Sequence, residues 1–129
     1  MKSSVKATEG IIPKNKPVQL KSGTLRRLIH PDTGTSKNVA VSLLVMNPGD
    51  EVRPHYHKMR EEVYYILSGE GTASHWGENG EEKIKLEKDL AVPIPPNVVH
   101  DIKCSGNEPL RILVIMAPPL PVDDAHCDG

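Results

Sequence analysis

Large aromatic side chains are scarce in this 129-residue sequence, which contains no Phe, one Trp and three Tyr. A core without Phe has to be filled mainly by Val, Ile, Leu and Met. We therefore predict an aliphatic core in which Trp76 and the tyrosines are the large rings.

Other absences exclude several classes of protein. The sequence has no run of 18 apolar residues, which excludes a transmembrane helix, and its first ten residues lack the apolar segment of a secretory signal. The formal net charge is −1 and basic residues are spread along the chain, so no nucleic-acid or membrane partner is indicated. Two cysteines, Cys104 and Cys127, do not make a disulfide framework, and we expect a cytoplasmic protein.

Twelve prolines and ten glycines interrupt the sequence every few residues and leave no room for a long amphipathic helix. Short apolar or alternating segments lie between these breakers, as at 39–46, 62–67, 82–87 and 110–116. Short strands separated by frequent turns are typical of an all-β sandwich or barrel. Because the length suits one substantial core, we predict a single all-β domain.

The segment 49–69, GDEVRPHYHKMREEVYYILSG, carries a His-x-His pair followed by two carboxylates. Side chains two apart on a strand point to the same face, so His55 and His57 are expected to project into one cavity together with Glu51 and Arg53. Two imidazoles beside a carboxylate are suited to a divalent first-row metal.

The spacing of this segment resembles the first motif of the cupin family, in which a His pair is followed by Glu and flanked by two Gly. The matching residues are Gly49, His55, His57, Glu62 and Gly69. The segment 95–100, PPNVVH, resembles the second motif and ends in His100. The resemblance implies a single-domain cupin β-barrel, or jelly roll, over residues 18–117. We expect an extended arm at 1–17 and a flexible tail at 118–129.

Three positions depart from the family pattern. Asn97 replaces the Gly of the turn in the second motif, although Asn tolerates the left-handed backbone that such a turn needs. Lys88-Asp89 stands where Gly-Asp usually opens that motif, and Cys104 stands where Asn closes it. These changes concern loop geometry rather than the ligands.

The resemblance also implies a metal site made of His55, His57, Glu62 and His100. Glu62 is preferred over Glu61 because it keeps the six-residue gap to Gly69. Such a set would fill four positions of an octahedral ion and leave two adjacent positions open. The expected cofactor is one divalent transition metal per chain, Fe, Mn, Ni, Co or Zn. The alternative is a polar lining without metal, in which every buried group would need a hydrogen-bond partner.

Arg53 and Tyr64 share strand faces with these ligands and are our candidate catalytic residues. An inward Arg could pair with a carboxylate or phosphate, and an inward Tyr could donate a hydrogen bond or proton. The alternatives are an ion pair between Arg53 and Glu51, and simple packing for Tyr64. We expect His30 and His75 to lie on the surface, and Cys104 either at the cavity rim or as a buried thiol.

The family resemblance implies a metal-dependent enzyme of the dioxygenase, decarboxylase, isomerase or cyclase type. Two adjacent open metal positions favour a small substrate that chelates through oxygen. The alternative is a non-catalytic module that binds or senses a sugar or another metabolite. We expect a homodimer, because Ile11, Ile12, Val18 and Leu20 in and after the arm need covering.

Overall fold

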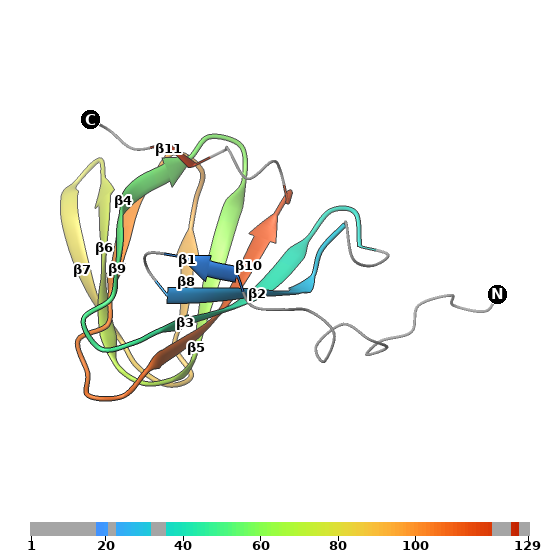
Figure 1. Ribbon diagram of the computed structural model, residues 1–129. Coiled ribbons are helices and arrows are strands. Elements are labelled where there is room, and N and C mark those ends of the chain that lie inside the picture. Colours follow the sequence, from blue (N-terminus) through green and yellow to red (C-terminus); the bar gives the residue numbers. More distant parts are fainter. Residues whose placement is uncertain (1–17, 21–22, 32–35, 120–124, 127–129) are drawn as a thin grey trace.

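The described part of the chain is built from strands alone (Figure 1). The computed structural model describes residues 18–20, 23–31, 36–119 and 125–126, and no helix that could cross a membrane is found among them. The strands are β1 (Val18–Leu20), β2 (Gly23–Ile29), β3 (Ala40–Met46), β4 (Glu51–His57), β5 (Glu61–Ser68), β6 (Gly71–Gly77), β7 (Gly80–Leu86), β8 (Ala91–Ile94), β9 (Val99–Lys103), β10 (Leu110–Ala117) and β11 (Ala125–His126). The predicted all-β fold is confirmed.

The strands form two antiparallel sheets. The first sheet has six strands in the order β1-β2-β3-β10-β5-β8, and the second has five in the order β11-β4-β9-β6-β7. β4, β6, β7 and β9 lie together on one side of the molecule in Figure 1, with β2, β3 and β10 on the other. The chain passes from one sheet to the other several times, as a jelly roll does.

The alternation of buried and less buried residues shows which side chains of the six-stranded sheet face the interior. On β3 the buried residues are Ala40, Ser42, Leu44 and Met46, at every second position. Cross-strand partners share a face, so Ala40, Ser42 and Leu44 lie in rows that continue over β10 and β5. One row runs Ala40, Met116, Glu62 and Ile94 across four strands, and it places a carboxylate on the inner face.

The core between the sheets is aliphatic, as predicted. Leu44, Ile66 and Ile112 from the first sheet pack in one cluster with Leu86 and Ile102 from the second. Apolar side chains from both sheets thus lose contact with water against each other, which is the main force holding the two sheets together.

The predicted role of the rings needs correction. Tyr64 is buried in the core, with an exposed fraction of 3%, but Trp76, Tyr56 and Tyr65 are only half-buried. Trp76 lies near the end of β6, next to the Gly77–Gly80 turn, where the strand leaves the core.

The expected arm at 1–17 lies outside the described residues, as does most of the expected tail. Of the tail, Ala125 and His126 pair with His57 and Tyr56 as the short strand β11. The homodimer expected from the arm stays a prediction.

Candidate metal centre

Three histidines form one row across the five-stranded sheet. His55 of β4 pairs with His100 of β9, and His100 pairs with His75 of β6. The ring centroids of His55 and His100 are 4.3 Å apart, and those of His100 and His75 are 6.4 Å apart. Pairing across strands therefore brings together histidines from three distant parts of the sequence.

Four of the side chains named from the sequence converge between the sheets. His55, His57, Glu62 and His100 each offer one ligand atom, and these four atoms lie within 4.8 Å of one another. Glu62 comes from the six-stranded sheet and the histidines from the five-stranded one. His57, Glu62 and His100 are buried and His55 is half-buried, whereas Glu61 is exposed. Burial thus distinguishes the two adjacent carboxylates in favour of Glu62.

Two of the imidazoles are oriented by the backbone in the same way. His55 Nδ1 is 2.8 Å from the Arg53 carbonyl oxygen, and His100 Nδ1 is 2.9 Å from the Val98 carbonyl oxygen. A carbonyl can only accept, so each Nδ1 carries the hydrogen and donates it. The lone pair of a neutral ring is then on Nε2, the nitrogen that remains available to a ligand.

The interior of the cluster carries an uncompensated polar atom. His100 is fully buried, and its Nε2 has no hydrogen-bond partner in the described structure. This nitrogen lies 3.4 Å from Glu62 Oε1, and His57 Nε2 lies 3.1 Å from the same oxygen. A lone pair that faces a carboxylate oxygen is repelled unless a cation or proton lies between them. The residues present therefore fit a bound metal ion.

The electrostatics of the cluster favour the forms that bind metal. Burial, and next the neighbouring His100, lower the pKa of His55 to about 4, so this ring is neutral at physiological pH. Burial acts to raise the pKa of Glu62, but its contacts with His100 and His57 outweigh burial, and the pKa is about 2. A neutral imidazole and an ionised carboxylate are the protonation states that ligation requires.

Arg60, in the turn between β4 and β5, is a site residue that the sequence analysis missed. Its Nη2 is 3.5 Å from His57 Nε2, and its Nε is 3.8 Å from Glu62 Oε2. Its side chain is only 13% exposed. The available signal was parity, because Arg60 precedes Glu62 and Tyr64 at the same two-residue spacing.

Arg53 does not share a face with the cluster as expected. Val52 pairs with Ile102 and His55 with His100, so β4 has one residue more than β9 between these pairs. This β-bulge puts His55 on the face of Val52, and Glu51 and Arg53 are exposed. Arg53 contributes its backbone carbonyl to His55, and a catalytic role for its side chain stays a prediction.

Tyr64 lies where the parity of β5 predicts. Its ring is buried, with its centroid 6.1 Å from that of His100. Burial, and next the negative charge of Glu62, raise the pKa of Tyr64 well above 10. The hydroxyl therefore stays protonated and could act as a donor, and its catalytic role also stays a prediction.

Two expectations about the remaining polar residues need correction. His75 is half-buried rather than on the surface, burial lowers its pKa, and its Nε2 is enclosed without a hydrogen-bond partner in the described structure. His30 is also half-buried. The sequence around these two histidines carries no signal for their burial, because burial depends on how the strands pair in the folded chain. Cys104 is a buried thiol, 4% exposed, the second of its two alternatives.

The turns that differ from the family pattern keep the needed backbone. Asn97 adopts a φ of 67° and donates its N–H to the His57 carbonyl at 2.7 Å, which ties this turn to the ligand strand. Asp89 of the Lys88-Asp89 turn adopts a φ of 70°.

Gly69, which matches the family pattern, has a φ of 86°, and a Cβ there would collide with the Pro109 carbonyl.

The sequence is similar to known proteins over most of its length. A family model described as a cupin domain matches residues 42–116. An uncharacterized protein of Methanocaldococcus jannaschii is 33% identical over 114 residues, which cover 88% of each chain. Polyketide synthase CurC of Streptomyces cyaneus is 29% identical over 105 residues, which cover 81% of this chain and 66% of that protein.

Solved structures with a similar fold include oxalate decarboxylases. That of Bacillus subtilis matches 97% of this chain with a TM-score of 0.81 and 18% identity, and that of Lactobacillus farciminis matches 84% with a TM-score of 0.77 and 20% identity. This chain spans about a third of both proteins, 33% and 32% of their chains. At these identities the likeness concerns the fold.

Proposed function

This chain belongs to the cupin domain family, and on that premise we propose that it is a metal-dependent enzyme acting on a small metabolite that chelates through oxygen. One divalent transition metal per chain, Fe, Mn, Ni, Co or Zn, would be held by His55, His57, Glu62 and His100.

The observation that carries the proposal is the buried Nε2 of His100. It lacks a hydrogen-bond partner among the described residues and lies 3.4 Å from a carboxylate oxygen. Leaving a buried polar atom unpaired costs about 1–3 kcal/mol, and a cation shared by the two groups removes that cost. If these residues only lined the interior without a metal, their buried polar groups would be expected to form hydrogen bonds with one another.

The chain's own residues would hold the metal ligands in position and supply a proton. A divalent metal, when bound, supplies Lewis-acid chemistry at a carbonyl, enol or carboxylate oxygen, or dioxygen chemistry if it is iron. The carbonyls of Arg53 and Val98 hold two of the imidazole rings in place. Tyr64 keeps its proton and could donate it to a substrate oxygen.

The reaction type is left open by the family. The relatives and structural neighbours include a polyketide synthase protein and oxalate decarboxylases, whose names denote different reactions. One fold hosts many chemistries, so we propose a dioxygenase, decarboxylase, isomerase or cyclase rather than one of these.

Metal analysis of the untagged protein tests the metal site. We expect one equivalent of divalent metal per chain after loading and desalting, and a His100→Ala variant that stays folded but loses most of the metal. If the wild-type chain and His100→Ala retained equal metal, the proposed centre would be wrong.

Turnover assays with the loaded protein test the enzymatic part. Oxalate-like acids and chelating diketones are suitable first substrates, because each can offer two oxygens to one ion. A loaded protein that binds such molecules without converting them would favour the alternative, a non-catalytic metabolite-binding module.

We further propose that the chain forms a homodimer through its N-terminal segment. Light scattering at micromolar protein concentration tests this state, and a monomeric mass would contradict it.

A further inference from the structure

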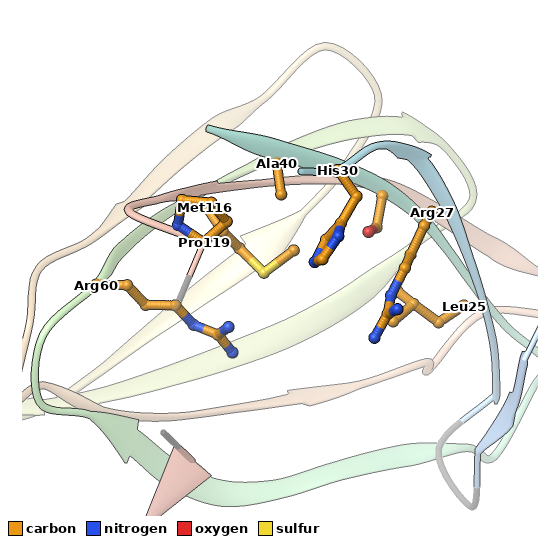
Figure 2. A pocket seen from close by; sticks show the side chains of 8 residues that line it. Leu25, Arg27, His30, Ala40, Arg60, Met116 and Pro119 are labelled. Atoms are coloured by element: carbon orange, nitrogen blue, oxygen red, sulfur yellow. The ribbon is translucent and has the colours of Figure 1, made fainter. Parts of the chain in front are cut away.

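A pocket of about 100 Å³ lies at one end of the six-stranded sheet, next to the metal cluster (Figure 2). Leu25 and Arg27 of β2, Ser42 of β3 and Met116 of β10 line it, with His30 and Arg60 from the adjoining turns. In Figure 2 the guanidinium groups of Arg27 and Arg60 and the ring of His30 extend into the same space.

Two residues that line the pocket carry a buried polar atom without a hydrogen-bond partner in the described structure. Ser42 is fully buried, and neither its Oγ nor the Nε of Arg60 has a hydrogen-bond partner in the described structure. Both atoms carry a hydrogen and can donate it. Buried donors without acceptors are rare in folded proteins. Arg60 Nε has Glu62 Oε2 at 3.8 Å, so the fully buried Ser42 Oγ is the donor that points to a missing acceptor.

The charge of the pocket indicates what kind of acceptor is missing. Two guanidinium groups line the pocket, of which that of Arg60 also lies 3.8 Å from Glu62 Oε2, and no carboxylate is among the described lining residues. Arginine offers a planar fork of donors that matches a carboxylate. Leu25 and Met116 add an apolar wall, which suits a short carbon substituent better than a fourth oxygen.

The pocket and the cluster share structural elements. Arg60 lines the pocket and lies 3.8 Å from Glu62 Oε2. Met116 also lines the pocket, and it pairs with Glu62 across β10 and β5, so their side chains are neighbours on the inner face. A molecule in the pocket would therefore lie beside the metal ligands.

We propose that this pocket binds the carboxylate of a small organic acid, with Ser42, Arg27 and Arg60 as donors. Its volume equals roughly three water molecules at about 30 Å³ each, which suits an acetate-sized group. The idea that this pocket holds part of a substrate rests on the proposed function. The binding of a carboxylate in the pocket can be measured independently of turnover.

Nuclear magnetic resonance titration of the full chain with acetate tests the pocket, in both the metal-free and the metal-loaded protein. We expect saturable shifts at residues around Ser42 and Arg60. Acetamide has the same size without the charge and should bind at least about tenfold more weakly, because hydrogen bonds to a charged group contribute more. Equal shifts with acetate and acetamide would overturn the proposal.

Two variants locate the binding to this pocket. Ser42→Ala removes one donor with little change in volume, and Arg27→Met removes one charge; each should weaken acetate binding about tenfold or more. Arg26→Met is the matched control, because Arg26 is the next residue on β2 and does not line the pocket. If Arg27→Met weakens binding no more than Arg26→Met, the assignment is wrong, and this comparison decides the matter even if Ser42→Ala fails to fold.

The same samples separate this inference from the proposed function. Metal analysis of the wild-type chain reports on the cluster, and acetate titration reports on the pocket. A chain that binds metal but not acetate would overturn only the proposal that this pocket binds a carboxylate. Acetate binding without metal would support a carboxylate pocket and refute the metal-dependent enzyme.

Discussion

His55 and His100 face each other across β4 and β9, and each donates its Nδ1–H to the carbonyl two residues before it in the chain. The two rings thus use equivalent backbone contacts, although one follows a β-bulge and the other a proline-rich turn. These contacts direct both Nε2 atoms away from the backbone that holds them. This arrangement orients two ligands without any other side chain.

Glu62→Gln and Glu61→Gln should differ sharply in metal binding. Glu62 is 5% exposed and belongs to the cluster, whereas Glu61 is exposed. Removing the charge at 62 leaves only neutral ligands, so we expect most of the metal to be lost. Metal analysis after desalting checks this, with Glu61→Gln as the control that keeps its metal. The reverse outcome would mean that the strand register is off by one.

The metal-free protein should lose stability in mild acid. The pKa of His55 is about 4 when folded and about 6.5 when unfolded, so the unfolded chain binds more protons between these values. The free energy of unfolding therefore falls as the pH drops from 6.5 to 4, by on the order of 3 kcal/mol from this group. Urea denaturation at several pH values checks it, and His55→Gln should flatten the fall.

Below pH 4.5 a second group should add to this loss. The pKa of Glu62 is about 2 in the folded chain, against 4.5 for an unperturbed glutamate, so the unfolded state again binds more protons as the pH drops. An unfolding free energy that stays constant from pH 7 to 4 would contradict the assignment of His55, and one that stays constant from pH 4 to 2.5 would contradict that of Glu62.

Tyr64→Phe should reduce turnover without emptying the metal site. The hydroxyl stays protonated because burial raises its pKa, and removing a general acid typically costs about 10²-fold or more in rate. The ring, which packs in the core, is retained. Tyr65→Phe is the control, because its hydroxyl donates to Asp89 on the exposed side. Steady-state rates of both variants check the prediction, and equal rates would make Tyr64 a packing residue.

Gly69→Ala should destabilise the fold more than Gly80→Ala. Both glycines have a positive φ, 86° and 96°, and such a backbone costs an Ala roughly 1–2 kcal/mol. At Gly69 the new methyl group would also collide with the Pro109 carbonyl, while nothing lies within 4 Å at Gly80. Thermal denaturation of the two variants compares these costs, and equal losses would contradict the close packing of this hairpin.

Strand parity predicted the part of the site that lies on a regular strand. Glu62, Tyr64 and Ile66 alternate on β5 and are all buried, as the spacing indicates. The same rule was wrong for Arg53, because a bulge in β4 shifts the alternation before His55. A bulge depends on the partner strand as well as on local residues, so parity along one strand does not reveal it.

The amino-acid sequence alone predicts an all-β fold with an aliphatic core, and the resemblance of its two motifs to the family pattern names the four residues of the candidate metal centre. Proline and glycine breakers, alternating strands and two spaced motifs are local features, and local features can be read along the chain. The folded chain alone brings Arg60 to this centre, His75 into one row with His100, and Ser42 and Arg27 to one pocket. These relations depend on which strands pair and in which register, and cooperative packing of the two sheets sets that pairing.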